Sequence, residues 1–124
     1  MKRLPMLLLA VMATACGGFR DEEARFLASN RGPDPVTFLI NGRQMEVAPG
    51  ATQRFTTIIP VPKNPYGVTG GPSAVDKVVG VTAEARNDRT GFKSVPRTCD
   101  AGVKIVTTVA WDGRSSFIDC LYSY

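Results

Sequence analysis

Two segments of alternating apolar and polar residues, each divided by a two-residue turn signal, constrain this chain to fold into antiparallel strands. In the first segment, Asn41-Gly42 separates residues 36–40 from residues 43–47. Asn-Gly suits a type I′ turn because both central residues need a positive φ. A turn of this length fixes the register and gives the hairpin one apolar face. The predicted cross-strand pairs are Ile40 with Arg43, Phe38 with Met45 and Val36 with Val47.

A second hairpin is predicted near the end of the sequence, where Asp112-Gly113 separates residues 103–111 from residues 114–122. Asp-Gly favours the same tight turn. That turn places Cys120 on the apolar face, and Phe117 and Leu121 on the opposite face. The predicted pairs are Trp111 with Arg114, Val109 with Ser116, Thr107 with Ile118, Ile105 with Cys120 and Val103 with Tyr122.

Three further strands are expected between the hairpins, over residues 52–59, 75–86 and 92–95. Pro and Gly interrupt residues 60–72, so we expect a long irregular loop there. About seven short strands, with turn signals roughly every eight to twelve residues, predict an all-β fold. The pattern is similar to antiparallel β-sandwiches of the immunoglobulin-like or transthyretin-like type, and the sequence leaves that choice open.

The first fifteen residues have the pattern of a secretory signal peptide. Met1-Lys2-Arg3 is a positively charged start, residues 4–13 form an apolar run, and small residues precede Cys16. As a helix, Leu4 to Phe19 would cover roughly 24 Å, against ~30 Å of bilayer hydrocarbon. The run is therefore better explained as a signal peptide than as a membrane-spanning helix.

The small residues before Cys16 resemble the lipobox of bacterial lipoproteins. The resemblance implies removal of residues 1–15, attachment of diacylglycerol to the Cys16 sulfur and acylation of its amine, which together anchor a protein stably. With Gly17 after the cysteine, the family pattern implies passage to the outer membrane of a double-membraned bacterium. Ala13-Thr14-Ala15 also fits the site of ordinary signal peptidase, which would leave Cys16 without lipid.

Two parts are expected after the signal peptide. Residues 16–34 are predicted to comprise the lipidated Cys16 and a polar tether, and residues 35–124 the β-sandwich domain. The tether segment opens with Gly-Gly and closes with Gly-Pro-Asp-Pro. The alternative is one or two helical turns over residues 21–29 that bury Phe26 and Leu27.

Cys99 and Cys120 are the two cysteines that remain once Cys16 carries lipid. Exported compartments are oxidising, so we expect these two to form a disulfide. In the chain-entropy model such a bridge stabilises the fold by roughly 3 kcal/mol. Cys99 is expected in the loop before the last hairpin, from which it can reach Cys120. Neither CxxC spacing nor His is present, so we expect no metal and no cofactor.

The chain has no His among its 124 residues, which excludes Ser-His-Asp and Cys-His catalytic systems. Loss of Lys2 and Arg3 with the signal peptide leaves 13 basic against 11 acidic side chains, a net charge of +2. The basic residues are scattered rather than gathered in a stripe, so no nucleic-acid partner is expected. The acidic residues form neither a glycosidase pair nor a calcium-binding loop.

A binding role remains, and three residues are the predicted partner contacts. Tyr66 is expected at the tip of the long loop, and Phe117 and Leu121, together with Leu39, on outer faces of the sheets. We expect a membrane-tethered, non-enzymatic binding or structural module of the bacterial envelope, on the periplasmic side or at the outer membrane. The alternative is an accessory periplasmic-side subunit that stabilises a larger respiratory, photosynthetic or secretory membrane complex. An envelope hydrolase is a minor alternative.

Overall fold

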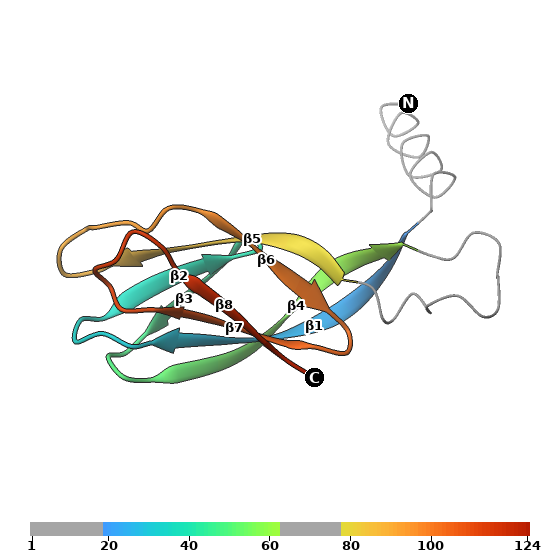
Figure 1. Ribbon diagram of the computed structural model, residues 1–124, viewed down its shortest axis with the longest axis horizontal. Coiled ribbons are helices and arrows are strands. Elements are labelled where there is room, and N and C mark those ends of the chain that lie inside the picture. The colour runs from blue at the N-terminus through green and yellow to red at the C-terminus, as the bar shows by residue number, and fades with distance from the viewer. Residues whose placement is uncertain (1–18, 63–77) are drawn as a thin grey trace, which may run out of the picture.

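The computed structural model describes residues 19–62 and 78–124, which form eight strands. The strands make two four-stranded sheets that face one another around a common core, so the expected all-β sandwich is confirmed (Figure 1). Within the described ranges, no helix is long and apolar enough to cross a membrane. The strands are β1 (Phe19–Asn30), β2 (Val36–Ile40), β3 (Arg43–Val47), β4 (Thr52–Pro62), β5 (Val78–Asn87), β6 (Arg97–Gly102), β7 (Val106–Trp111) and β8 (Asp119–Ser123).

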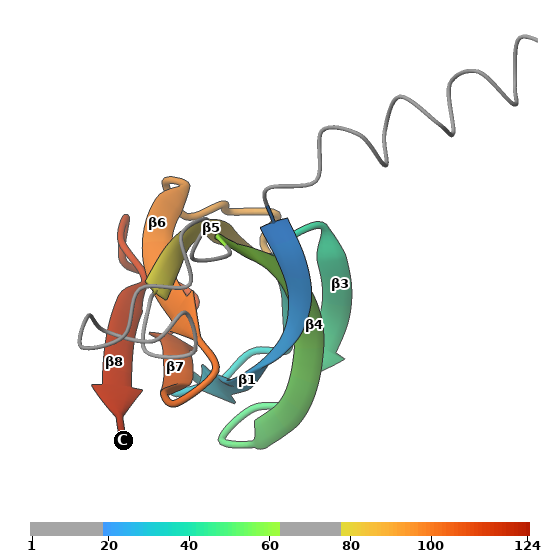
Figure 2. The ribbon, with the colours of Figure 1, turned by 90° about the vertical axis from the view of Figure 1, so that its right-hand side faces the viewer.

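Sheet A has the strand order β4-β1-β7-β8, and sheet B has the order β3-β2-β5-β6. Neighbouring strands are antiparallel except β1 and β7, which are parallel. In the immunoglobulin arrangement the first strand lies at a sheet edge, whereas β1 here lies inside its sheet. The strand order of sheet A therefore differs from that of the immunoglobulin arrangement. Viewed along the long axis, β6 lies next to β8 on one side and β3 next to β4 on the other (Figure 2).

The first predicted hairpin is confirmed in detail. β2 and β3 pair in the expected register, with Phe38 opposite Met45. Asn41 has a φ of 50° and Gly42 a φ of 77°, as a type I′ turn requires. The local turn chemistry was therefore sufficient to set this register.

The second hairpin forms, but its predicted register is wrong. Val109 pairs with Cys120 rather than with Ser116, four residues further along. The physical reason is that the Asp112 side chain folds residues 112–118 into a wider loop, which is described below. Because the shift is an even number of residues, the faces are unchanged: Cys120 points inward and Leu121 outward.

The tether predicted within residues 16–34 is also wrong for residues 19–30, which form β1. This strand makes eleven residue pairs with β4 and six with β7. Its alternation explains the burial, since Ala24, Phe26 and Ala28 face the core. The sandwich thus begins at Phe19. The predicted signal peptide and Cys16 lie outside the described residues.

Three other boundaries differ from expectation. β4 continues through Pro60 to Pro62, because an edge strand tolerates residues that lack an N–H. Cys99 lies in strand β6 instead of a loop. Residues 92–95 form no strand and make one isolated bridge to β5. The first residues of the strand predicted over 75–86 lie outside the described residues, as does the predicted loop around Tyr66.

The core lies between the two inner sheet faces. Its largest fully buried side chains include Phe26, Phe38, Ile59 and Ile118. The predicted disulfide between Cys99 and Cys120 is confirmed. It joins β6 and β8, so it links an edge strand of one sheet to an edge strand of the other.

Candidate binding surface

Four loops meet at the end of the sandwich opposite the start of β1, which we call the distal end (Figure 1). They comprise residues 31–35, 48–51, 88–96 and 112–118. Backbone hydrogen bonds tie these loops to the strands and to one another, so the distal end is fixed. The bonds join Asn30 N to Ala51 O at 2.9 Å, Arg31 N to Trp111 O at 2.8 Å, Asp88 N to Pro35 O at 2.9 Å and Val95 N to Ser116 O at 2.7 Å.

A buried polar cluster holds the distal end from inside. The Nδ2 of Asn87 donates to Asp34 Oδ2 at 3.1 Å and to the Gly113 carbonyl at 3.0 Å. Its Oδ1 accepts from the backbone N–H groups of Arg89 and Thr90. The Nε of Arg89 donates to Asp34 Oδ1 at 2.7 Å, and this bond, followed by that from Asn87, lowers the pKa of Asp34. These partners satisfy one another, so the cluster has a structural role.

The loop of residues 112–118, which we call the Phe117 loop, is ordered by its first side chain. The Oδ1 of Asp112 accepts from the N–H groups of Arg114 and Ser115 and from the Ser115 hydroxyl, at 2.7–2.9 Å. These bonds, those from Ser115 first, lower the pKa of Asp112 to about 2. Trp111 Nε1 donates to the Ser115 carbonyl at 2.8 Å. Together they make a compact capped turn in place of the predicted two-residue turn.

Phe117 is exposed although the backbone on both sides of it is fixed. The Ser116 carbonyl accepts from the N–H of Val95 at 2.7 Å, and the Ile118 carbonyl accepts from Arg97 Nη1 at 2.8 Å. The Phe117 side chain is 66% exposed, while Ile118 is fully buried in the core. A large aromatic side chain is therefore displayed on a preorganised loop, which lowers the ordering cost of binding.

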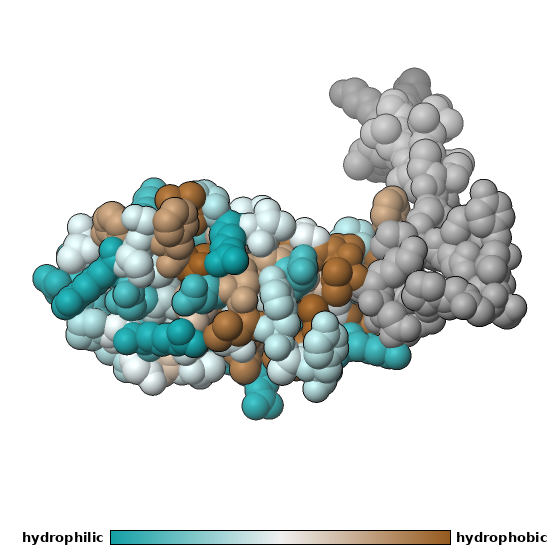
Figure 3. Space-filling model, in the orientation of Figure 1, coloured by the Kyte–Doolittle hydropathy of each residue, from teal (hydrophilic) through white to brown (hydrophobic). Residues whose placement is uncertain are grey.

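Two other exposed apolar side chains accompany Phe117. Val95, which is 47% exposed, lies beside the loop through its bond to Ser116, and Leu121, 46% exposed, follows on β8. Figure 3 shows brown side chains over the distal loops and along β8, with teal charged groups between them. Of the predicted contacts, Phe117 thus lies in the Phe117 loop and Leu121 on the strand that directly follows it, whereas Leu39 lies on the outer face of sheet B.

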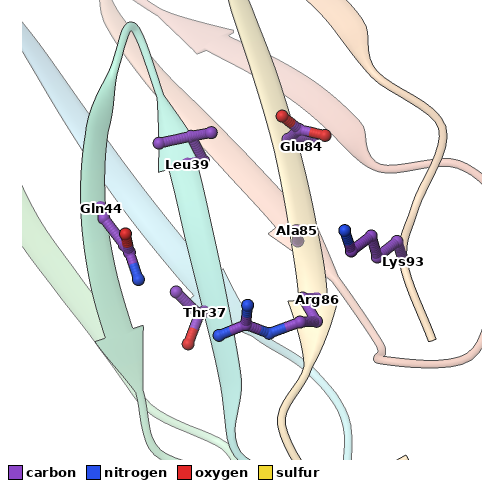
Figure 4. A pocket seen from close by; sticks show the side chains of 7 residues that line it. All are labelled: Thr37, Leu39, Gln44, Glu84, Ala85, Arg86 and Lys93. Carbon is purple, nitrogen blue, oxygen red and sulfur yellow. The ribbon is translucent and has the colours of Figure 1, made fainter. Parts of the chain in front are cut away.

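A shallow pocket of about 120 Å³ lies on that outer face of sheet B (Figure 4). Ligand sites usually begin at about 300 Å³. Thr37 donates to both carboxylate oxygens of Asp88, and Arg86 pairs with the same carboxylate at 3.5 Å. The Arg86 charge is thus already balanced, and the volume of the pocket leaves room only for a small group. Its lining residues are Thr37, Leu39, Gln44, Glu84, Ala85, Arg86 and Lys93.

Across residues 19–62 and 78–124, no three acidic or cysteine side chains gather as metal ligands. Comparison of the chain with protein-family models, curated proteins and solved structures found no match. The Phe117 loop, with Val95 and Leu121, is the exposed apolar surface that the distal end presents on a hydrogen-bonded backbone.

The sequence interpretation missed Val95 and Arg97 at this surface. Both lie in a stretch predicted to be a short strand and a loop, so nothing local connected them with residues 116–118. A signal for the Phe117 loop was present: Asp112 is followed three residues later by Ser115, a spacing at which an Asp side chain caps a turn.

Proposed function

We propose that this chain is a non-enzymatic binding module of the bacterial envelope, anchored to a membrane by lipid on Cys16, which binds a protein partner through the Phe117 loop. The observation that carries the proposal is the exposed Phe117 side chain held between two hydrogen-bonded carbonyls. Aromatic side chains are enriched in interface cores and dominate the energy of many interfaces. A loop whose backbone is already held in place loses less conformational entropy when a partner covers it.

Two observations support export. The Cys99–Cys120 disulfide joins the two sheets, and such bonds persist in oxidising compartments outside the cytoplasm. The charged start, apolar run and small residues before Cys16 supply a route for export and a point for lipid attachment.

The partner is either a separate envelope component or a larger membrane complex of which this chain is an accessory subunit. The exposed apolar group of Val95, Phe117 and Leu121 favours a protein partner, because carbohydrate or nucleotide sites need convergent polar groups. Both arrangements use the same surface. The two arrangements differ in the proteins that co-purify with this chain: a single partner in one case and the subunits of a membrane complex in the other.

The test is purification of the tagged full chain from its native membranes in mild detergent, with intact-mass analysis of everything recovered. Phe117→Ser should lose the co-purifying partner, while Leu39→Ser, on the outer face of sheet B, should retain it. Recovery of the same partner with both variants would contradict a role for the Phe117 loop. A stoichiometric set of membrane subunits would indicate the accessory role, and a mass without acyl groups would exclude the lipid anchor.

A further inference from the structure

Only two residues, Gly17 and Gly18, separate Cys16 from the first residue of β1. The sequence alone predicted a tether of about eighteen residues, but most of that segment is strand. Three Cα-to-Cα steps span at most about 11 Å even when fully extended. Whatever is attached to Cys16 is therefore held close to Phe19.

Phe19 lies at the tip of a two-stranded ribbon that extends beyond the rest of sheet A. Residues 19–24 of β1 pair with residues 57–62 of β4, whereas β7 joins β1 only from Arg25 onward. Figure 1 shows this ribbon projecting from the body at the end opposite the distal loops. The ladder is continuous over all eleven pairs, so the ribbon and the body form one unit.

We infer that the tip of this ribbon sits at the lipid surface with Phe19 in contact with it, and that the ribbon is a stalk holding the Phe117 loop away from the membrane. The inference rests on the lipidation of Cys16 proposed above. Phe19 is apolar and 61% exposed. From Phe19 to Asn30, β1 rises about 36 Å at roughly 3.3 Å per residue, and its last residue pairs with Trp111, directly before the Phe117 loop.

The charges along the ribbon favour an upright arrangement over a flat one. Asp21, Glu22 and Glu23 lie along it and outnumber the single cation, Arg25, in an open groove of about 530 Å³, which Ile58 and Val103 also border. Laying this side on the bilayer would desolvate carboxylates, which is costly, whereas the tip presents Phe19. Arg20, next to the tip, is paired with Glu22 at 2.6 Å. Contact with lipid therefore needs no anionic headgroup.

The test uses the full lipidated chain reconstituted into phosphatidylcholine vesicles whose acyl chains carry bromine, a short-range quencher of tryptophan fluorescence. Phe19→Trp and Phe117→Trp form a matched pair, because the two side chains are similarly exposed. Wild-type protein supplies the baseline from Trp111, which is buried at the distal end. The fluorescence added at position 19 should be largely lost in brominated vesicles, and that added at position 117 should be retained.

A third variant tests the short link. Inserting ten Gly and Ser residues between Gly18 and Phe19 in the Phe19→Trp chain should restore fluorescence while the protein still floats with vesicles. Vesicle-bound protein with no quenching at position 19, or equal quenching at both positions, would overturn the stalk inference alone. Protein that fails to float with vesicles would overturn the lipid anchor of the proposed function, and the inference with it.

Discussion

The hydroxyl oxygen of Tyr122 accepts a 3.0 Å hydrogen bond from the backbone N–H of Asp100, and so links strand β8 of sheet A to strand β6 of sheet B. The Cys99–Cys120 disulfide joins the same two edge strands. Arg97, on β6, bonds a carbonyl directly before β8. Unpaired strand edges invite pairing with other chains, and these three links engage both edges internally on this side of the sandwich.

The opposite side is closed by side chains of the first hairpin. Arg43 Nη1 donates to the Thr56 carbonyl at 2.9 Å, and its guanidinium lies 5.8 Å from the centre of the Phe55 ring. Asn41 Nδ2 donates to the Ile58 carbonyl at 3.2 Å. On this side hydrogen bonds join the two sheets in place of a disulfide. Reduction therefore tests only the link between β6 and β8.

Removing the disulfide should lower the free energy of unfolding by roughly 3 kcal/mol, because the bridge no longer restricts the unfolded chain. The double variant Cys99→Ala/Cys120→Ala removes a bond between residues 21 apart in sequence. Urea denaturation measures the change, with reduced wild-type protein as the matched comparison. An unchanged unfolding midpoint in both samples would contradict a stabilising role for the bond.

Truncation of two adjacent side chains, Phe117 and Ile118, should change the stability of the protein by very different amounts. Phe117→Ser should change stability by no more than about 0.5 kcal/mol, because its side chain is exposed. Ile118→Ala should cost about 2–5 kcal/mol, because it leaves a cavity in the core. Thermal and urea unfolding of the two variants provide the measurement. Strong destabilisation by Phe117→Ser would mean that this ring supports the fold.

Asn87→Ala should destabilise the protein by about 1–3 kcal/mol, because it leaves buried partners without a hydrogen bond. Asn87 donates to Asp34 and Gly113 and accepts from two backbone N–H groups. Gln53→Ala, at an exposed position of β4, serves as the control. Faster amide exchange around residues 88–90 should accompany this loss of stability. Equal stability of Asn87→Ala and Gln53→Ala would contradict a structural role for the buried polar cluster.

Gly32→Ala should destabilise the distal end, because the added Cβ would overlap the backbone carbonyl of Asp112. Backbone cannot move aside as a side chain can, so the cost should be about 1–3 kcal/mol. Gly80→Ala is the comparison, since its Cβ would meet only the Thr98 methyl group. Unfolding of both variants by urea should show the larger loss for Gly32→Ala, and the reverse order would be inconsistent with the close approach.

Acid should weaken the distal end before the rest of the sandwich. The folded-state pKa of Asp112 is about 2, below its ordinary value of 3.8, and that of Asp34 is also lowered. A lowered pKa gives stability that is present above about pH 4 and is lost as pH falls through the folded-state value. Amide exchange between pH 5 and pH 2 measures this. Asp112→Asn should reduce the pH dependence of amide exchange at Ser115. An unaltered pH dependence would exclude the Asp112 carboxylate as its cause.

Local sequence determined the parts of this protein whose interactions lie close together along the chain. Asn41-Gly42 fixed the first hairpin because its turn admits positive φ at both positions. The alternation of apolar and polar residues predicted the all-β class, and the pair Cys99 and Cys120 predicted the disulfide. The exposure of Leu121 also followed from alternation, because an even shift of register leaves each strand side chain on its face.

Only the tertiary structure decided the rest. Residues 19–30 look polar enough for a tether, and they become a strand because β4 and β7 supply partners on both sides. Residues 97–102 become β6 by pairing with β5. The Asp112 side chain folds the Phe117 loop locally, but the position of this loop on the sandwich is set by Asn87 and Val95, distant in sequence, which bond its carbonyls. In each case the deciding hydrogen-bond partner is distant along the chain, so no local pattern could specify it.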